Sequence, residues 1–156
     1  MVNILLCGNE KVFDGALTQL ISMTNRTKET IHVYIMTMEL TRVREDFKAI
    51  TEEQIGFLNH VIQQKNPDNR VEKLDVTELY EQEFGGCVNE TAYCTPYTLL
   101  RLLADKFTQI PDKLLYLDID IMIANDIRQL WEIDVTGYEY AAVKEKYGCW
   151  LIRPDY

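Results

Sequence analysis

Two aspartates, Asp118 and Asp120, follow an apolar segment at residues 114–117 and are separated by a single isoleucine. Side chains alternate between the two faces of a strand, so both carboxylates point the same way if the backbone stays extended. Adjacent carboxylates repel each other unless a proton or a metal ion separates them, and oxygen ligands suit hard cations such as Mg2+ or Mn2+. The pair therefore predicts a divalent cation site. The alternative is a pair of strand-end aspartates that only starts a turn, because Asp-x-Asp is a common tripeptide.

A longer pattern surrounds these aspartates. It consists of Asp112-Lys-Leu-Leu-Tyr-Leu-Asp-Ile-Asp-Ile-Met-Ile, then Asn125-Asp-Ile-Arg-Gln-Leu-Trp131, and finally Asp134. The pattern resembles the "YLDxDxxV…D…LW" core of the family-8 glycosyltransferases, and the resemblance extends over nearly the whole chain, most specifically over residues 95–134. It implies that Asp118 and Asp120 hold a Mn2+ or Mg2+ ion that bridges the diphosphate of a UDP-sugar. It also implies transfer of a hexose from that donor, with retention of configuration, to an unidentified saccharide, lipid or protein acceptor.

The charge of the chain limits its partners. The formal net charge is −9 and no Lys/Arg-rich patch is present, so no nucleic-acid-binding surface is expected. An acidic protein that binds an anionic nucleotide needs a local cation, which a metal ion supplies. No CxxC spacing occurs among the cysteines, which argues against zinc and for reduced thiols; they are Cys7, Cys87, Cys94 and Cys149. With no signal peptide and no run of about 18 apolar residues, we expect a cytoplasmic protein without a transmembrane segment.

Strand and helix patterns alternate along the chain. Short apolar runs predict strands at residues 2–7, 31–36, 71–76, 114–117 and 140–143. Helical spacing predicts helices over residues 13–23, from the capping box Thr51–Gln54 to Asn66-Pro67, and from Thr95-Pro96 through Phe107. This order indicates an α/β fold with a mostly parallel, Rossmann-like sheet and helices on both faces. The resemblance specifies an A-type glycosyltransferase fold with its carboxyl-terminal part missing.

Ligands of such sheets bind at the carboxyl ends of strands, so the loop after the first strand is the next candidate. Gly8 lets the backbone approach a ligand closely, although a simple turn explains it as well. The family usually places base- and ribose-binding Asp or Asn side chains where this chain has Asn9 and Lys11, and Lys11 departs from that pattern. Its ammonium could reach a phosphate or a base edge, or stay solvated. The residues that we assign to donor binding are Cys7, Gly8, Asn9, Lys11, Thr98, Arg101 and Ile119.

Arg101 stands alone among leucines, in Thr98-Leu-Leu-Arg-Leu-Leu. The segment resembles the family's "TYYRLxLPEL" helix, whose arginine projects toward the nucleotide sugar. A guanidinium that is buried without an acceptor is costly, so Arg101 must reach the surface or find carboxylates. We expect it on the sheet-facing side of its helix, near Asp118, Asp120 or a diphosphate oxygen. Asp118, Asp120 and Arg101 are therefore the predicted catalytic residues, which stabilise charge on the departing UDP.

Family members continue into an "FNxGVxxxN" segment and an "HxxGxxKPW" motif whose histidine completes the metal site. This sequence ends at Tyr156, and neither His32 nor His60 has matching surroundings. We therefore expect residues 1–156 to form a single nucleotide-sugar-binding domain, the donor-binding part of a larger or truncated enzyme. An apolar edge left uncovered would favour self-association.

Two alternatives stay open. One is a nucleotide-sugar or metal-binding module without catalysis. The other is a phosphatase of the haloacid-dehalogenase type, which is disfavoured because Met122 stands where that family has Thr or Val.

Overall fold

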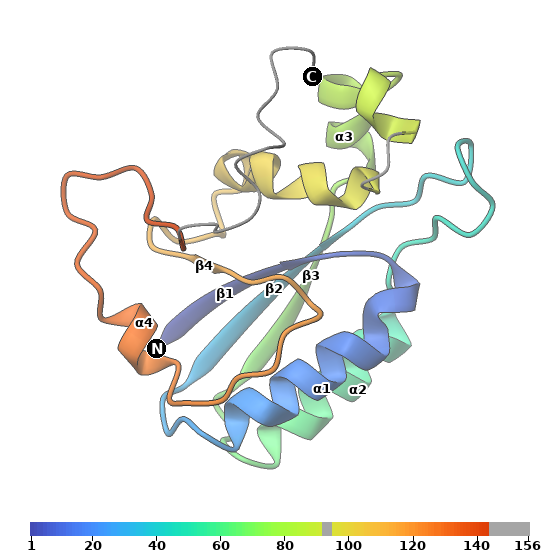
Figure 1. Ribbon diagram of the computed structural model, residues 1–156. Coiled ribbons are helices and arrows are strands. Elements are labelled where there is room, and N and C mark those ends of the chain that lie inside the picture. Colours follow the sequence, from blue (N-terminus) through green and yellow to red (C-terminus); the bar gives the residue numbers. More distant parts are fainter. Residues whose placement is uncertain (92–94, 144–156) are drawn as a thin grey trace.

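A computed structural model of the chain describes residues 1–91 and 95–143. At its centre is a four-stranded sheet of β1 (Val2–Cys7), β2 (Ile31–Thr37), β3 (Arg70–Asp75) and β4 (Leu115–Tyr116), in the spatial order β3-β2-β1-β4 (Figure 1). Every neighbouring pair of strands is parallel. The mostly parallel, Rossmann-like α/β sheet that the sequence predicts is thus confirmed.

The first three predicted strands are confirmed to within one residue at either end. The fourth is shorter than predicted, because only Leu115 and Tyr116 pair with β1. The strand predicted at residues 140–143 is wrong. Tyr140 is 79% and Val143 93% exposed, and this segment pairs with no strand in the described part of the chain. An apolar run forms a strand only where a neighbour completes its hydrogen bonds.

Two helices, α1 (Phe13–Thr24) and α2 (Glu52–Gln63), cover one face of the sheet (Figure 1). Their buried apolar residues recur every three or four positions and meet the strand residues of the same core; on the helices they are Ala16, Leu20, Met23, Ile55, Leu58 and Ile62. The capping box at the start of α2 is confirmed, since the Thr51 hydroxyl accepts from the Gln54 amide at 3.1 Å and the Gln54 side chain accepts from the Thr51 amide at 2.9 Å.

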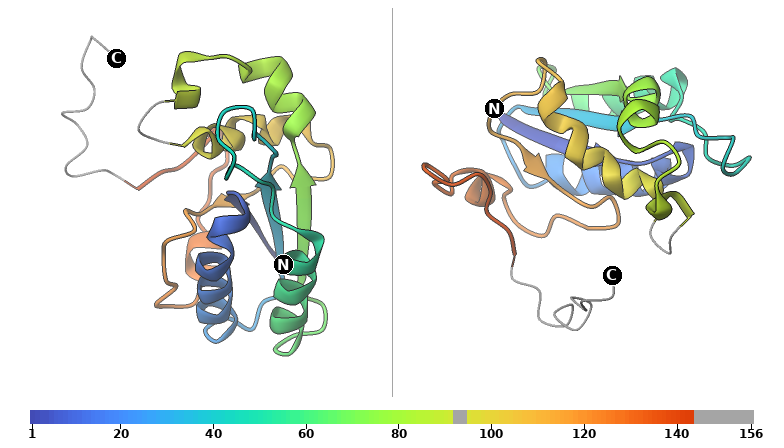
Figure 2. Two further views of the ribbon diagram at one scale, coloured as in Figure 1. Left: turned by 90° about the vertical axis from the view of Figure 1, so that its right-hand side faces the viewer. Right: turned by 90° about the horizontal axis from the view of Figure 1, so that it is seen from above.

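The opposite face is covered by α3 (Thr77–Phe84) and η3 (Pro96–Lys106), so helices lie on both faces as predicted (Figure 2). Leu5 packs into the core on this side, while Ile4 and Leu6 pack with α1 and α2. This explains why β1 is apolar without alternation.

The third predicted helix is present as the 3-10 helix η3, with Pro96 in its first turn. Four further short elements were not predicted: η1 (Glu10–Val12), α3, η2 (Val88–Thr91) and α4 (Arg128–Trp131). In α3, Tyr80 is the one buried residue, so the sequence carries little periodic apolar signal there.

Among the described residues, no helix is both long and apolar enough to cross a membrane. Large apolar side chains are instead exposed along residues 121–143; they include Met122, Leu130, Ile133, Tyr138, Tyr140 and Val143. Exposed apolar surface of this kind is typical of interaction sites, and self-association of the chain stays a prediction.

Candidate functional site

The strand order reverses direction between β1 and β4. From β1 the chain proceeds to β2 and β3 on one side, and it returns to place β4 on the other side. The loops that leave β1 and β4 therefore diverge, which is where open α/β sheets bind ligands. A pocket of about 280 Å³ lies at this point, and its lining comes from the β1 loop, the β2–α2 loop, the start of η3 and the end of β4. Its lining residues are Cys7, Gly8, Asn9, Lys11, Val12, Arg44, Asp46, Phe47, Thr95, Tyr97, Thr98, Tyr116 and Asp118.

Most predicted site residues border this one pocket. Those that do are Cys7, Gly8, Asn9, Lys11, Thr98 and Asp118. Arg101, Ile119 and Asp120 stand outside its lining. The pocket therefore brings together the loop after β1 and the segment of Asp118, the two parts of the sequence that the motifs indicated. Three of the predicted residues do not line it.

The loop after β1 is tightly packed. The Asn9 side chain caps η1 by accepting a hydrogen bond from the Lys11 amide at 3.1 Å, and the Gly8 amide donates to the Met36 carbonyl at 3.0 Å. A Cβ atom at Gly8 would lie 2.5 Å from a Val12 methyl carbon, which is closer than real Cβ contacts. Glycine is required here because the loop folds back on itself beside the pocket.

The Cys7 thiol borders the pocket at the end of β1. Burial, the largest cause, raises its pKa to about 12; Arg101 opposes this and Asp118 adds to it. The thiol therefore stays protonated at neutral pH, which makes it a poor nucleophile. In this site Cys7 provides an apolar wall.

The backbone at Asp118–Asp120 is not extended, so the condition under which strand alternation points both carboxylates the same way is not met. The strand ends at Tyr116, and residues 119 and 120 form a turn. Ile119 packs against α1 at this turn, where a Cβ atom on Gly15 would come within 2.9 Å of it. Gln19 fixes the same turn, because its side-chain amide donates to the Asp118 carbonyl at 3.0 Å.

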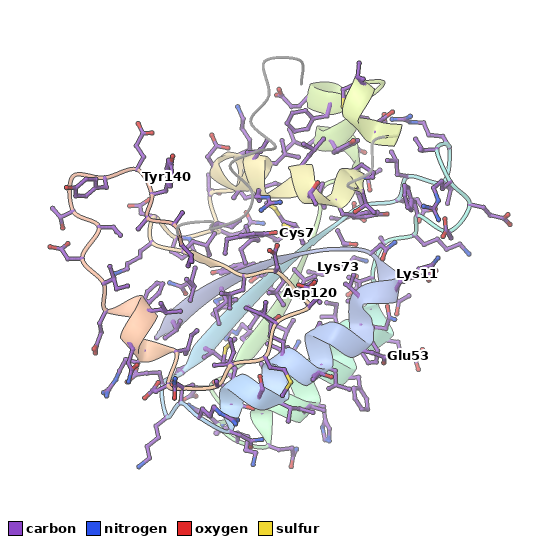
Figure 3. The ribbon with its side chains drawn as sticks, in the orientation of Figure 1. Cys7, Lys11, Glu53, Lys73, Asp120 and Tyr140 are labelled. Atoms are coloured by element: carbon purple, nitrogen blue, oxygen red, sulfur yellow. The ribbon has the colours of Figure 1, made fainter. Side chains whose placement is uncertain are left out.

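The two carboxylates face solvent. Both aspartates are exposed, and the Tyr116 hydroxyl donates to Asp118 Oδ1 at 2.7 Å. Figure 3 shows Asp120 on the loop after β4, where the chain turns back over α1. No hydrogen bond or ion pair engages the Asp120 side chain within residues 1–91 and 95–143. Its oxygens are accessible to a ligand.

Arg101 does not form the predicted ion pair with Asp118 or Asp120 in the part of the chain that the structure describes. It is exposed, its Nε donates to the Thr98 carbonyl at 2.8 Å, and its guanidinium lies 4.5 Å from the centre of the Tyr116 ring. The Tyr116 ring and the Thr98 carbonyl hold the guanidinium while water still reaches it. Arg101 therefore avoids the desolvation cost of a buried arginine. Through Tyr116, Arg101 nevertheless lies one side chain from Asp118.

The carboxylate pair fits a hard cation in its chemistry. Mg2+ is commonly held by one or two carboxylates, with water and phosphate oxygens completing its coordination. The described residues contain no group of three or more His, Cys, Asp or Glu side chains that could hold a metal. His32 is engaged elsewhere, with its ring nitrogens 3.1 Å from Glu72 and 3.1 Å from the Tyr34 hydroxyl. A bound ion would therefore need further oxygen ligands from a diphosphate or from water.

The family model described as Glycosyl transferase family 8 matches residues 3–152. The chain belongs to glycosyl transferase family 8. A protein of Haemophilus influenzae named "Putative glycosyltransferase" is 23% identical to this chain over 146 residues, which is 94% of this chain and 40% of that protein.

Solved structures of glycosyltransferases share the fold of this family 8 chain. The active-site mutant Q189E of LgtC matches with a TM-score of 0.64 and 17% identity, and LgtC in complex with donor and acceptor sugar analogs with 0.58 and 18%. Each match covers 86% of this chain and 43% of the LgtC chain. The bifunctional glycosyltransferase WbbM, without ligand, gives 0.62 and 13% over 86% of this chain and 21% of its own. The chain thus spans less than half the length of the proteins that it matches here.

Within this family 8 chain, sequence reasoning missed several pocket residues. They are Val12, Arg44, Asp46, Phe47, Thr95, Tyr97 and Tyr116. Tyr116 could have been found, because it stands two residues before Asp118 at the end of the same strand. The β2–α2 loop residues carry no motif, and only the fold brings them to the pocket.

Proposed function

We propose that this chain binds the nucleoside diphosphate part of a UDP-sugar in the pocket between β1 and β4. Residues 1–156 would act as one nucleotide-sugar-binding domain that takes part in transferring a hexose, with retention of configuration, to an acceptor. One observation carries the proposal: the β1 loop, the start of η3 and Asp118 border a single pocket where the strand order reverses. Family membership supports the reaction class.

The metal proposal rests on the two exposed carboxylates. Asp118 and Asp120 would hold Mn2+ or Mg2+, which supplies positive charge against the diphosphate and stabilises UDP as a leaving group. Without such a cation, the diphosphate would face Asp118 in a protein of net charge −9. Electrostatic repulsion would then oppose binding.

The remaining residues have positioning roles in this proposal. Gly8 and Asn9 would border the nucleoside, and Lys11 would contact a phosphate. Tyr116 would orient Asp118 through its 2.7 Å hydrogen bond, and Arg101, which lies on the Tyr116 ring, would approach the diphosphate or the sugar. Cys7, a neutral thiol, would help to exclude water.

A binding module without catalysis is the second candidate function. This candidate is favoured because the described residues include no third His, Cys, Asp or Glu side chain that could bind a metal together with the two carboxylates. A metal site that is open on one side would bind a donor but stabilise the transition state poorly. The phosphatase alternative has lost its support, because the chain belongs to a glycosyltransferase family.

Calorimetric titration with UDP, in Mn2+ and in EDTA, tests the proposal. We expect binding in Mn2+ and at least tenfold weaker binding in EDTA. Asp120→Asn should weaken the Mn2+-supported binding by about 1–3 kcal/mol, the cost of losing a charged partner. Asp14→Asn is the matched control, because Asp14 is an exposed aspartate of α1 outside the pocket. Equal affinity with and without the metal would refute the metal-dependent site. Release of UDP from a UDP-hexose with an acceptor present would then separate transfer from binding alone.

A further inference from the structure

Three charged side chains meet on one wall of the pocket. Lys11 Nζ forms an ion pair with Asp46 Oδ2, and the Arg44 guanidinium binds both oxygens of the same carboxylate, at 3.1 Å through Nε and 2.8 Å through Nη2. All three residues line the pocket, and Lys11 and Arg44 are its only lining cations among the described residues. The two cations therefore share one internal anion at the place where a ligand would bind.

The wall that carries this cluster is held in place by the core. Phe47 is buried, its ring packs edge-on against Tyr97 at 5.5 Å, and the Arg44 guanidinium lies 4.6 Å from its centre. The β2–α2 loop is also fastened to η1, since the Glu10 amide donates to the Lys48 carbonyl at 3.0 Å. The positions of Arg44 and Asp46 are thus set by packing, and the ends of their side chains remain accessible.

A carboxylate between a lysine and an arginine occupies the position that a phosphate takes in many anion sites. Guanidinium groups bind carboxylate and phosphate oxygens through the same paired hydrogen bonds. We propose that Asp46 is an internal placeholder for a phosphate group, which holds Lys11 and Arg44 at the pocket until a nucleoside diphosphate replaces it. The identity of the anion rests on the proposed function.

This exchange is a competition between two anions. The hydrogen bond from Lys11 and the neighbouring Arg44 keep the pKa of Asp46 below its ordinary value, so Asp46 stays ionised at neutral pH. When a phosphate binds, the Asp46 carboxylate must either leave Lys11 and Arg44 or share these two cations with the phosphate. Asp46 therefore lowers affinity for the ligand while it keeps the site assembled.

If Asp46 is a placeholder, removal of its charge should strengthen UDP binding. Asp46→Asn keeps the shape of the side chain but removes its charge, so the variant should bind UDP in Mn2+ about three- to tenfold more tightly than the wild type. Lys11→Gln and Arg44→Gln should each weaken UDP binding, by roughly tenfold. Affinity for uridine, which has no phosphate, should change by less than about twofold in all three variants. Glu45→Gln and Lys48→Gln are matched controls, because both are exposed charges of the same loop that do not line the pocket.

A second measurement separates the placeholder from a purely structural role. In a protein that already carries Lys11→Gln and Arg44→Gln, the addition of Asp46→Asn should no longer tighten UDP binding, because no cation is left to release. Weaker or unchanged UDP binding by the single Asp46→Asn variant would overturn the placeholder, as would an equal gain for uridine. If the wild type binds UDP in a metal-dependent way in that case, the proposed function survives alone. If the wild type binds no UDP at all, both proposals fail.

Discussion

Two walls of the pocket, those formed at the ends of β1 and β4, differ in how firmly the fold holds them. The β1 wall, residues 7–12, follows a six-residue strand that is paired on both sides, and its Gly8 and Asn9 are buried. The β4 wall, residues 116–120, follows a two-residue strand at the edge of the sheet, and its two carboxylates are exposed. The β1 wall is therefore held by buried packing, whereas the β4 wall is held by a few hydrogen bonds and by the contact of Ile119 with α1.

This difference indicates a division of labour. Buried backbone and a capped turn give the β1 wall a fixed shape, which suits recognition of a rigid nucleoside. The carboxylates of the β4 wall repel each other and prefer water until a cation joins them. At Gly8 and Asn9 the β1 wall should therefore respond to changes in shape, whereas the β4 wall should respond to changes in charge and to metal removal.

The largest effect is expected on the β1 wall from Gly8→Ala. The new methyl group would lie 2.5 Å from Val12, whose branched side chain has few alternative rotamers, so the free energy of unfolding should fall by about 1–3 kcal/mol. Gly56→Ala is the control in helix α2, where nothing lies within 4 Å, and should gain roughly 0.5–1 kcal/mol. Urea unfolding measures both. Equal stability of the two variants would mean that the β1 wall is not tightly packed.

On the β4 wall, Tyr116→Phe should act on the metal more than on the fold. Loss of the hydrogen bond to Asp118 should weaken Mn2+ binding in the presence of UDP by about tenfold, as is typical when a residue that orients a ligand is removed. The free energy of unfolding should change by less than about 1 kcal/mol, because the bond is exposed. Paramagnetic resonance of free Mn2+ gives the affinity, and Tyr138→Phe, an exposed tyrosine outside the pocket, is the control. Identical Mn2+ affinities would remove Tyr116 from the site.

Burial of the Cys7 thiol in the β1 wall predicts a loss of stability at high pH. The Cys7 pKa rises from 9.0 to about 12 on folding, so above pH 9 the unfolded chain releases this proton while the folded protein keeps it. The contribution of Cys7 to the free energy of unfolding is therefore fully present below pH 9 and declines as the pH rises toward 12. At pH 10 this loss is about 1.4 kcal/mol. Urea unfolding at pH 8 and pH 10 should show a drop that is larger in the wild type than in Cys7→Ala by that amount. Equal drops would show that the thiol is not in an apolar environment.

The smallest effect is expected from Arg101, which contacts the β4 wall from outside. Arg101→Met should weaken UDP binding by about 1 kcal/mol, roughly fivefold. The free energy of unfolding should fall by about 0.5 kcal/mol, the value of an exposed cation–π contact. Arg128→Met removes another exposed arginine, on α4, and serves as the control. A larger loss of stability than of UDP affinity would assign Arg101 a structural role.

The sequence predicted the β1 wall better than the β4 wall for a physical reason. Five of the six residues of β1 are apolar, and such a segment is satisfied only in a strand that is buried on both faces, so β1 and the loop at its end follow from local pattern and sheet geometry. The turn at residues 119–120 depends on contacts of Ile119 and Asp118 with Gly15 and Gln19, about 100 residues earlier in the chain. No local pattern contains that information.

The same limit applies to charged side chains. Arg101 was expected near carboxylates because a buried arginine needs them, but the Tyr116 ring and a backbone carbonyl hold it at the surface. Arg44 and Asp46 reach the pocket through a loop whose path is set by the buried ring of Phe47. An apolar pattern fixes where a chain is buried, whereas the pairing of exposed charges depends on tertiary distances.

Diffraction from a crystal of this chain grown with UDP and Mn2+, recorded at the manganese absorption edge, tests the central claim most directly. We predict one manganese peak between the carboxylates of Asp118 and Asp120, at about 2.2 Å from their oxygens. The diphosphate should lie between that peak and the side chains of Lys11 and Arg44, with the uracil beside Gly8 and Asn9. A manganese peak elsewhere, or UDP bound outside the pocket between β1 and β4, would contradict the account.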